Sequence, residues 1–122
     1  MTKILQNHYV LAVPDADASA HFYTTVLGFA EAFRGDGWRF VKRDTCMIML
    51  GECPDAIAPS DLGDHSYFAY LVVDDLDAYW DEVRDLGVEV TSEPADKPWG
   101  MREFGIRTPD GHRLMIGQDL EK

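Results

Sequence analysis

The sequence predicts an α+β protein built from two tandem βαβββ modules, in which each helix covers one face of a mixed sheet. Three observations lead to this fold class. A stretch near the N-terminus is repeated in the second half of the chain, strand-like segments surround both copies, and a glycine follows each predicted helix.

The repeat pairs residues 14–29 with residues 73–88. Each copy follows an apolar run, begins with an aspartate able to cap a helix N-terminus, and ends in Leu-Gly. Glycine tolerates the left-handed backbone that ends many helices, so both copies are predicted helices. Apolar residues recur at helical spacing, namely Ala18, Phe22 and Val26 in the first copy and Leu76, Tyr79, Trp80 and Val83 in the second.

Strand-like sequence lies on both sides of each predicted helix. In the first module the expected strands are residues 9–13, 29–33, 38–42 and 46–50, with turns at 35–37 and 43–44. In the second module they are residues 67–73, 88–91, 101–107 and 112–117, with a Pro-rich loop at 93–98 and a turn at 108–111. The first module therefore covers about residues 1–52, a linker about 53–64, and the second module about 65–122, all within one domain.

The net charge of −11 comes from 22 acidic residues against 11 lysines and arginines. Such a surface repels phosphate backbones, so nucleic acid is not an expected partner, and it attracts cationic ligands. Cys46 and Cys53 are too few for a disulfide framework, and their spacing is not that of a CxxC motif. The sequence shows no membrane-length apolar run and no signal segment, so we expect a soluble, cytoplasmic protein.

The sequence offers little sign of catalytic machinery. It contains no recognisable Ser/His/Asp or Cys/His pattern and no glycine loop that would hold a phosphate. Asp110 and Gly111 are better explained as a hairpin turn. A carboxylate pair for acid–base chemistry stays open in so acidic a chain, but the spacing selects no particular pair.

An ordered set of motifs covers nearly the whole chain. The motifs are VPD at residues 13–15, FY at 22–23, VLGF at 26–29, GW at 37–38, PWGMREF at 98–104 and TPDGHRL at 108–114. Together with Phe40 and Asp44, they resemble the vicinal oxygen chelate superfamily, and within it the bleomycin-resistance and glyoxalase branch. The resemblance implies a homodimer whose two clefts form between halves of different subunits. It is less specific for function, because this fold hosts many chemistries.

The resemblance also implies where a metal would bind. Metal-dependent members hold one divalent ion through four side chains, one from the first and one from the last strand of each half. The matching positions here are His8, Met49, Phe68 (or Tyr67, one residue away) and Met115. Only His8 suits a hard or borderline ion, and a catalytic zinc site needs about three protein ligands, so no metal is predicted. His65 and Glu103 stay as candidates to complete a site around His8.

The side chains expected to line the cleft are mostly thioethers and aromatic rings. Strand alternation places every second residue on the face of the metal-equivalent positions. With nearby loop residues, the predicted ligand-binding set is His8, Trp38, Phe40, Met47, Met49, Phe68, Tyr70, Trp99, Arg102, Glu103 and Met115. Arg102 and Glu103 alternate on one strand, so only one of the two is expected to face the cleft. For Phe40 and Met47 the alternative is plain core packing.

These residues favour a non-catalytic binding protein of the bleomycin-resistance type. We expect it to sequester an aromatic and, given the acidic surface, cationic small molecule by stacking, without metal or another cofactor. A competing hypothesis is a metal-dependent lyase, isomerase or dioxygenase that uses His8. A third is a structural or regulatory dimer with an idle cavity. Neither nucleic acid nor a membrane is an expected partner.

Overall fold

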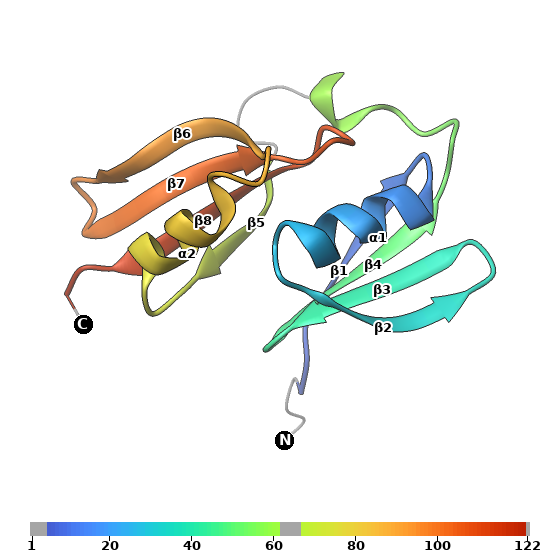
Figure 1. Ribbon diagram of the computed structural model, residues 1–122, viewed down its shortest axis with the longest axis horizontal. Coiled ribbons are helices and arrows are strands. Elements are labelled where there is room, and N and C mark those ends of the chain that lie inside the picture. Colours follow the sequence, from blue (N-terminus) through green and yellow to red (C-terminus); the bar gives the residue numbers. More distant parts are fainter. Residues whose placement is uncertain (1–4, 62–66, 122) are drawn as a thin grey trace. The chain divides into compact units, whose positions relative to one another are not determined.

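The computed structural model describes residues 5–61 and 67–121. The chain divides into two compact units, Met1–Ile57 and Ala58–Lys122. Each unit contains one four-stranded sheet and one α-helix, which confirms the predicted α+β class with two tandem modules (Figure 1). The end of the predicted linker and His65 lie outside the described residues.

The first unit runs β1 (His8–Val13), α1 (Ala16–Thr25), β2 (Ala30–Gly35), β3 (Trp38–Arg43) and β4 (Cys46–Glu52). Its strands lie in the order β1-β4-β3-β2, and β1 pairs with β4 in parallel while the other pairs are antiparallel. The first and last strands of the unit are therefore neighbours.

The second unit repeats this arrangement after a short 3-10 helix, η1 (Pro59–Asp61). Its elements are β5 (Tyr67–Val72), α2 (Leu76–Val83), β6 (Glu89–Asp96), β7 (Met101–Arg107) and β8 (Arg113–Asp119). The strand order is β5-β8-β7-β6, again with the first and last strands parallel. The two halves thus share one topology, as the sequence repeat predicts.

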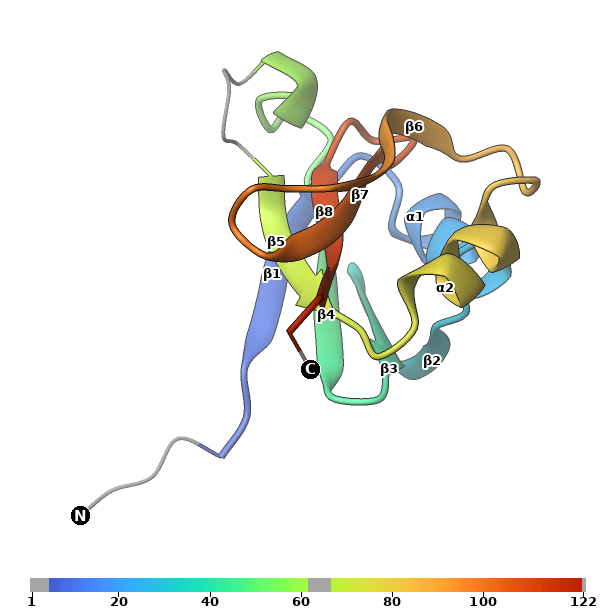
Figure 2. The same ribbon diagram turned by 90° about the vertical axis from the view of Figure 1, so that its left-hand side faces the viewer.

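Each helix covers one face of its own sheet, and the described residues of that unit place no helix on the opposite face (Figure 1 and Figure 2). The apolar core lies between helix and sheet. Its members include Leu11, Val13, Phe22, Tyr23, Val41, Ile48 and Leu50 in the first unit, and Leu76, Tyr79, Val83, Phe104, Ile106, Leu114 and Ile116 in the second. No helix in the described part of the chain has the length and apolar character needed to cross a membrane.

Aspartates cap both helices, as the sequence predicts. Asp15 accepts a hydrogen bond from the backbone N–H of Ala18, and Asp75 accepts one from that of Ala78, each at 3.1 Å. A second acceptor reaches each helix from the last strand of its sheet. Glu52 Oε1 lies 3.1 Å from the first N–H of α1, and Gln118 Oε1 lies 2.8 Å from that of α2. These contacts fix the start of each helix against its own sheet.

Glycines follow both helices with left-handed backbone, since φ is 76° at Gly28 and 82° at Gly87. This confirms the predicted stops. The buried face of α1 differs from the predicted one. Ala18 is exposed, and the buried residues of the helix begin with Ala16. The buried residues of α1 are Ala16, Ser19, Ala20, Phe22 and Tyr23.

The predicted loop at residues 93–98 is wrong for its first four residues, since β6 continues to Asp96. The strand is the edge of its sheet and therefore tolerates Pro94, which cannot donate a backbone hydrogen bond. Its register against β7 shifts between Ser92 and Ala95, so the strand passes the proline by a bulge-like irregularity.

Replacing the α2 cap by alanine, Asp75→Ala, should lower the free energy of unfolding by about 1 kcal/mol, because the Ala78 N–H loses its acceptor. Asp74→Ala is the matched control: it removes the same charge from the preceding exposed position, which does not cap the helix. Urea unfolding of the two variants checks the prediction. Equal losses in both would show that the cap contributes nothing beyond its charge.

Candidate ligand-binding site

The face of the first sheet that has no helix is apolar and partly exposed. Neighbouring strands place Val10, Met49 and Phe40 in register, and Phe33 pairs with Phe40 on the next strand. The rings of Phe33 and Phe40 lie 4.8 Å apart, and Trp38 meets Phe40 edge to face at 6.2 Å. Trp38 is 39% exposed and Phe33 50% exposed, so this face presents aromatic rings for stacking.

A glycine makes room for Trp38 on this face. A Cβ atom built on Gly51 would lie 2.9 Å from the indole ring, so any side chain there would push the ring away. Met47 and Met49, which precede this glycine on β4, are both half-buried. The structure therefore brings four predicted residues together on the first sheet: Trp38, Phe40, Met47 and Met49.

His8 begins β1 opposite Met47 and is exposed, with Nε2 3.0 Å from Gln6 Oε1. The other metal-equivalent positions carry thioethers or an aromatic ring, which do not make a donor set for a divalent ion. Within residues 5–61 and 67–121, no three His, Cys, Asp or Glu side chains are grouped closely enough to hold a metal ion. The residues at the family's metal positions therefore do not fit a divalent cation.

The open face of the second sheet carries a buried carboxylate. Glu103 on β7 is 6% exposed, and its Oε2 accepts two hydrogen bonds. The Tyr70 hydroxyl on β5 donates one at 2.5 Å, and the Trp99 indole Nε1–H, from the loop before β7, donates the other at 2.9 Å. Both donors are neutral, so they stabilise the carboxylate without cancelling its charge.

The same hydrogen bond changes the acidity of Tyr70. Burial raises the pKa of the Tyr70 hydroxyl, and the hydrogen bond to Glu103 and the nearby negative charge raise it further. Tyr70 is therefore a neutral donor at ordinary pH. Its ring crosses β8 at Gly117, where a built Cβ atom would overlap the phenol oxygen. Gly117 thus permits Tyr70 to reach across the sheet.

Gly105 makes room for Met115 in the same way on the neighbouring strand. A Cβ atom there would lie 2.8 Å from Met115 Sδ, so the glycine gives the predicted Met115 its place on the open face. Met115 pairs in register with Tyr70 on one side and Gly105 on the other. Met115, Tyr70, Trp99 and Glu103 are the predicted residues that the structure brings together on the second sheet.

Arg102 lies on the opposite face from Glu103. Its guanidinium donates to Asp77 on α2 and to Asp96 on β6, each at 3.0 Å. Of the two alternating residues, Glu103 is therefore the one on the open face, and Arg102 ties the helix to the sheet. These hydrogen bonds, the one to Asp77 first, raise the pKa of Arg102.

Phe68 is half-buried on β5 and meets His112 edge to face, with ring centroids 6.1 Å apart. His112 is 8% exposed, although it directly follows the turn at residues 108–111. The reason is local. The His112 N–H donates to Thr108 Oγ1 and its carbonyl accepts from the Thr108 N–H, which folds the turn over residue 112.

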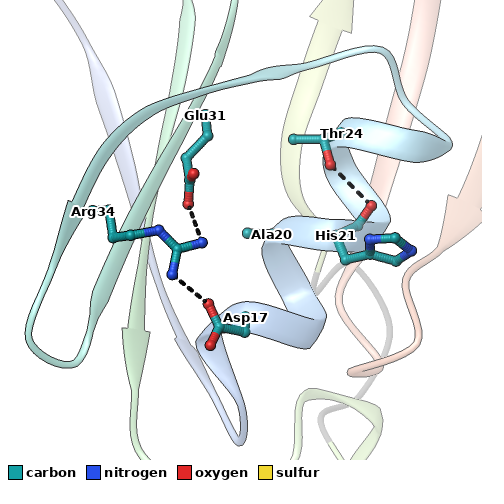
Figure 3. Close-up of a pocket in the computed structure, with 6 residues that line it drawn as sticks. All are labelled: Asp17, Ala20, His21, Thr24, Glu31 and Arg34. Atoms are coloured by element: carbon teal, nitrogen blue, oxygen red, sulfur yellow. Dashed lines mark hydrogen bonds and ion pairs between the residues drawn. The ribbon is translucent and has the colours of Figure 1, made fainter.

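A hollow of about 340 Å³ lies between α1 and β2 of the first unit (Figure 3). Arg34 bridges Asp17 and Glu31 across it, each at 3.1 Å. A hydrogen bond from Arg39 lowers the pKa of Asp17, with Arg34 acting in the same direction. The charged groups of this hollow are therefore already paired within the chain.

Sequence reasoning missed Phe33, Gly51 and Gly117. Phe33 ends the predicted strand 29–33, and only the register against β3 shows its contact with Phe40. The two glycines each stand two residues after a predicted methionine, at equivalent places in the repeat. This shared position of the two glycines is the sequence feature that indicates room for a ring across the last strand of each sheet.

The profile of the Glyoxalase/Bleomycin resistance protein/Dioxygenase superfamily matches residues 5–116. A bleomycin resistance protein of Klebsiella pneumoniae is 30% identical over 115 residues, which cover 86% of this chain and 85% of that protein. An uncharacterised protein of Mycobacterium bovis is 25% identical over 126 aligned positions, which cover 92% of this chain and 82% of that protein.

Two solved structures are similar over most of the chain. A bleomycin resistance determinant encoded on the transposon Tn5 has a TM-score of 0.77 at 28% identity, covering 95% of this chain and 98% of that one. A bleomycin-binding protein from bleomycin-producing Streptomyces verticillus, complexed with copper(II)-bleomycin, has a TM-score of 0.75 at 24% identity, covering 95% and 97%. The second likeness concerns the fold alone.

The fold is that of a protein with two βαβββ modules, and the described residues of each module place a helix on one face of its sheet only. The chain belongs to the Glyoxalase/Bleomycin resistance protein/Dioxygenase superfamily.

The raised pKa of Tyr70 predicts a pH dependence of stability. A tyrosine that binds its proton more tightly in the folded state stabilises the protein below its ordinary pKa of 10.0, and this contribution is lost as pH rises towards the higher folded value. In Tyr70→Phe, the free energy of unfolding should therefore fall less steeply above pH 10 than in the wild type.

Urea unfolding at several pH values checks this. Tyr67→Phe is the matched control, because Tyr67 lies on the same strand, is 43% exposed and makes no hydrogen bond to Glu103. The same slope in wild type and Tyr70→Phe would contradict the proposed link between Tyr70 and Glu103.

Proposed function

We propose that this chain is a binding protein of the bleomycin-resistance type, which sequesters an aromatic, cationic small molecule without metal and without turnover. The observation that carries the proposal is the buried Glu103 carboxylate on the open face of the second sheet, which accepts hydrogen bonds from the Tyr70 hydroxyl and the Trp99 indole. A negative charge flanked by aromatic groups suits a planar ligand that bears a positive charge.

The first sheet supports the same ligand class. Its open face offers Trp38, Phe33 and Phe40 as exposed or half-buried rings, and planar molecules stack on such rings. The net charge of −11 raises the local concentration of cations around the whole molecule. Relatives named as bleomycin resistance proteins support an antibiotic-like ligand. We also propose a homodimer, as the resemblance to this branch of the superfamily implies.

Bleomycin is the first ligand to test. Trp99→Ala should weaken its binding about tenfold, because one stacking surface and one donor to Glu103 are lost together. Trp80→Phe should leave the affinity unchanged, since Trp80 lies on α2 and packs against Phe104 on the helix side of the sheet, with ring centroids 5.2 Å apart. Isothermal titration of metal-free bleomycin into both variants and the wild type measures the difference.

Absence of binding to wild-type protein, or equal losses in both variants, would count against a ligand site on this face. Metal analysis of the purified protein tests the competing enzyme hypothesis. A stoichiometric divalent ion that disappears in His8→Ala would favour it over sequestration.

A further inference from the structure

We infer that Glu103 selects ligands whose positive charge carries N–H groups, such as an ammonium, amidinium or guanidinium, over cations that cannot donate a hydrogen bond. The inference rests on the proposed function and adds to it the chemical form of the charge. In this selection Tyr70 and Trp99 are positioning residues, because their hydrogen bonds act on the ligand's charge through Glu103, while the Trp99 ring also offers a stacking surface.

The first step is the division of labour between the two carboxylate oxygens. Oε2 accepts from both the Tyr70 hydroxyl and the Trp99 indole, so its two lone pairs are used. Among the described residues, none donates a hydrogen bond to Oε1. One oxygen is therefore fixed by the protein, and the other keeps its full capacity to accept.

The second step is the missing counter-charge. No arginine, lysine or histidine of the described segments forms an ion pair with Glu103. Arg102, the preceding residue, points to the other face and pairs with Asp77 and Asp96, while Arg107 on the same strand pairs with Glu89. A carboxylate that is 6% exposed and has no cationic partner is costly to keep buried, and a bound cation would offset that cost.

The third step concerns the kind of cation. A quaternary ammonium presents only C–H groups, so it would satisfy the charge and the aromatic rings but leave Oε1 without a donor. A cation with N–H groups neutralises the charge, contacts the aromatic rings and also donates a hydrogen bond to Oε1. Because a charge-assisted hydrogen bond is stronger than a contact between unlike charges alone, the N–H cation should bind more tightly.

Two probes of equal charge and equal ring test this: naphthylmethylammonium and its N,N,N-trimethyl counterpart. Wild-type protein should bind the primary ammonium about tenfold more tightly than the trimethyl compound in isothermal titration. Glu103→Gln, which keeps the shape of the side chain, should reduce this ratio to about one. Circular dichroism verifies that the variant is folded.

Three further variants separate charge from position. Glu89→Gln removes one negative charge from the neighbouring edge strand and should keep the wild-type preference. Tyr70→Phe and Trp99→Phe each keep an aromatic ring but remove one donor to Oε2, so each should lower the ratio about threefold. A purely structural role would change the affinity for both probes alike and leave the ratio unmoved.

The inference is overturned if wild-type protein binds both probes equally, if Glu103→Gln keeps the preference, or if the ammonium probe does not bind at millimolar concentration. The proposed function is judged separately by bleomycin. Bleomycin binding together with any of these results would leave sequestration standing and remove only the role assigned to Glu103.

Discussion

A carboxylate held by two neutral donors organises the open face of the second sheet. Glu103 is buried, Tyr70 and Trp99 both donate to its Oε2, and no positive side chain of the described segments compensates its charge. The fold keeps such a group because the donors stabilise the anion where solvent is scarce. The position of both aromatic rings and the candidate site depend on these two hydrogen bonds. Burial raises the pKa of Tyr70, and its own hydrogen bond to Glu103 raises it further.

The two halves use one topology for different surfaces. Each last strand has a glycine two residues after a methionine, Gly51 or Gly117, and each glycine lets an aromatic side chain lie across the strand. In the first unit that side chain is Trp38, which leads to an apolar cluster. In the second it is Tyr70, which carries a hydroxyl to Glu103. The repeat therefore gives both halves the same backbone arrangement. The side chains on the two open faces differ, so the first sheet presents an apolar aromatic cluster and the second presents a carboxylate.

Much of the fold could be predicted from the sequence, because caps, glycine stops and strand alternation are local signals. They identify the helices through Asp15 and Asp75 and the strand 101–107 at its observed bounds. The site was predicted less completely. Alternation shows that Arg102 and Glu103 face opposite ways, but not which faces the helix, because that depends on Asp77 and Asp96 in other elements. The continuation of β6 through Pro94 could not be predicted either, because the edge position of this strand depends on the pairing of the whole sheet.

The most direct test of the account is the nuclear magnetic resonance signal of the Trp99 indole N–H. In ¹⁵N-labelled wild-type protein, a hydrogen bond to a carboxylate should shift this proton downfield of the Trp38 and Trp80 indole protons, and Glu103→Gln should move it back upfield. If the Trp99 signal lies at the position of a solvated indole and is unchanged by Glu103→Gln, the carboxylate is not held as described and the account of the site is wrong.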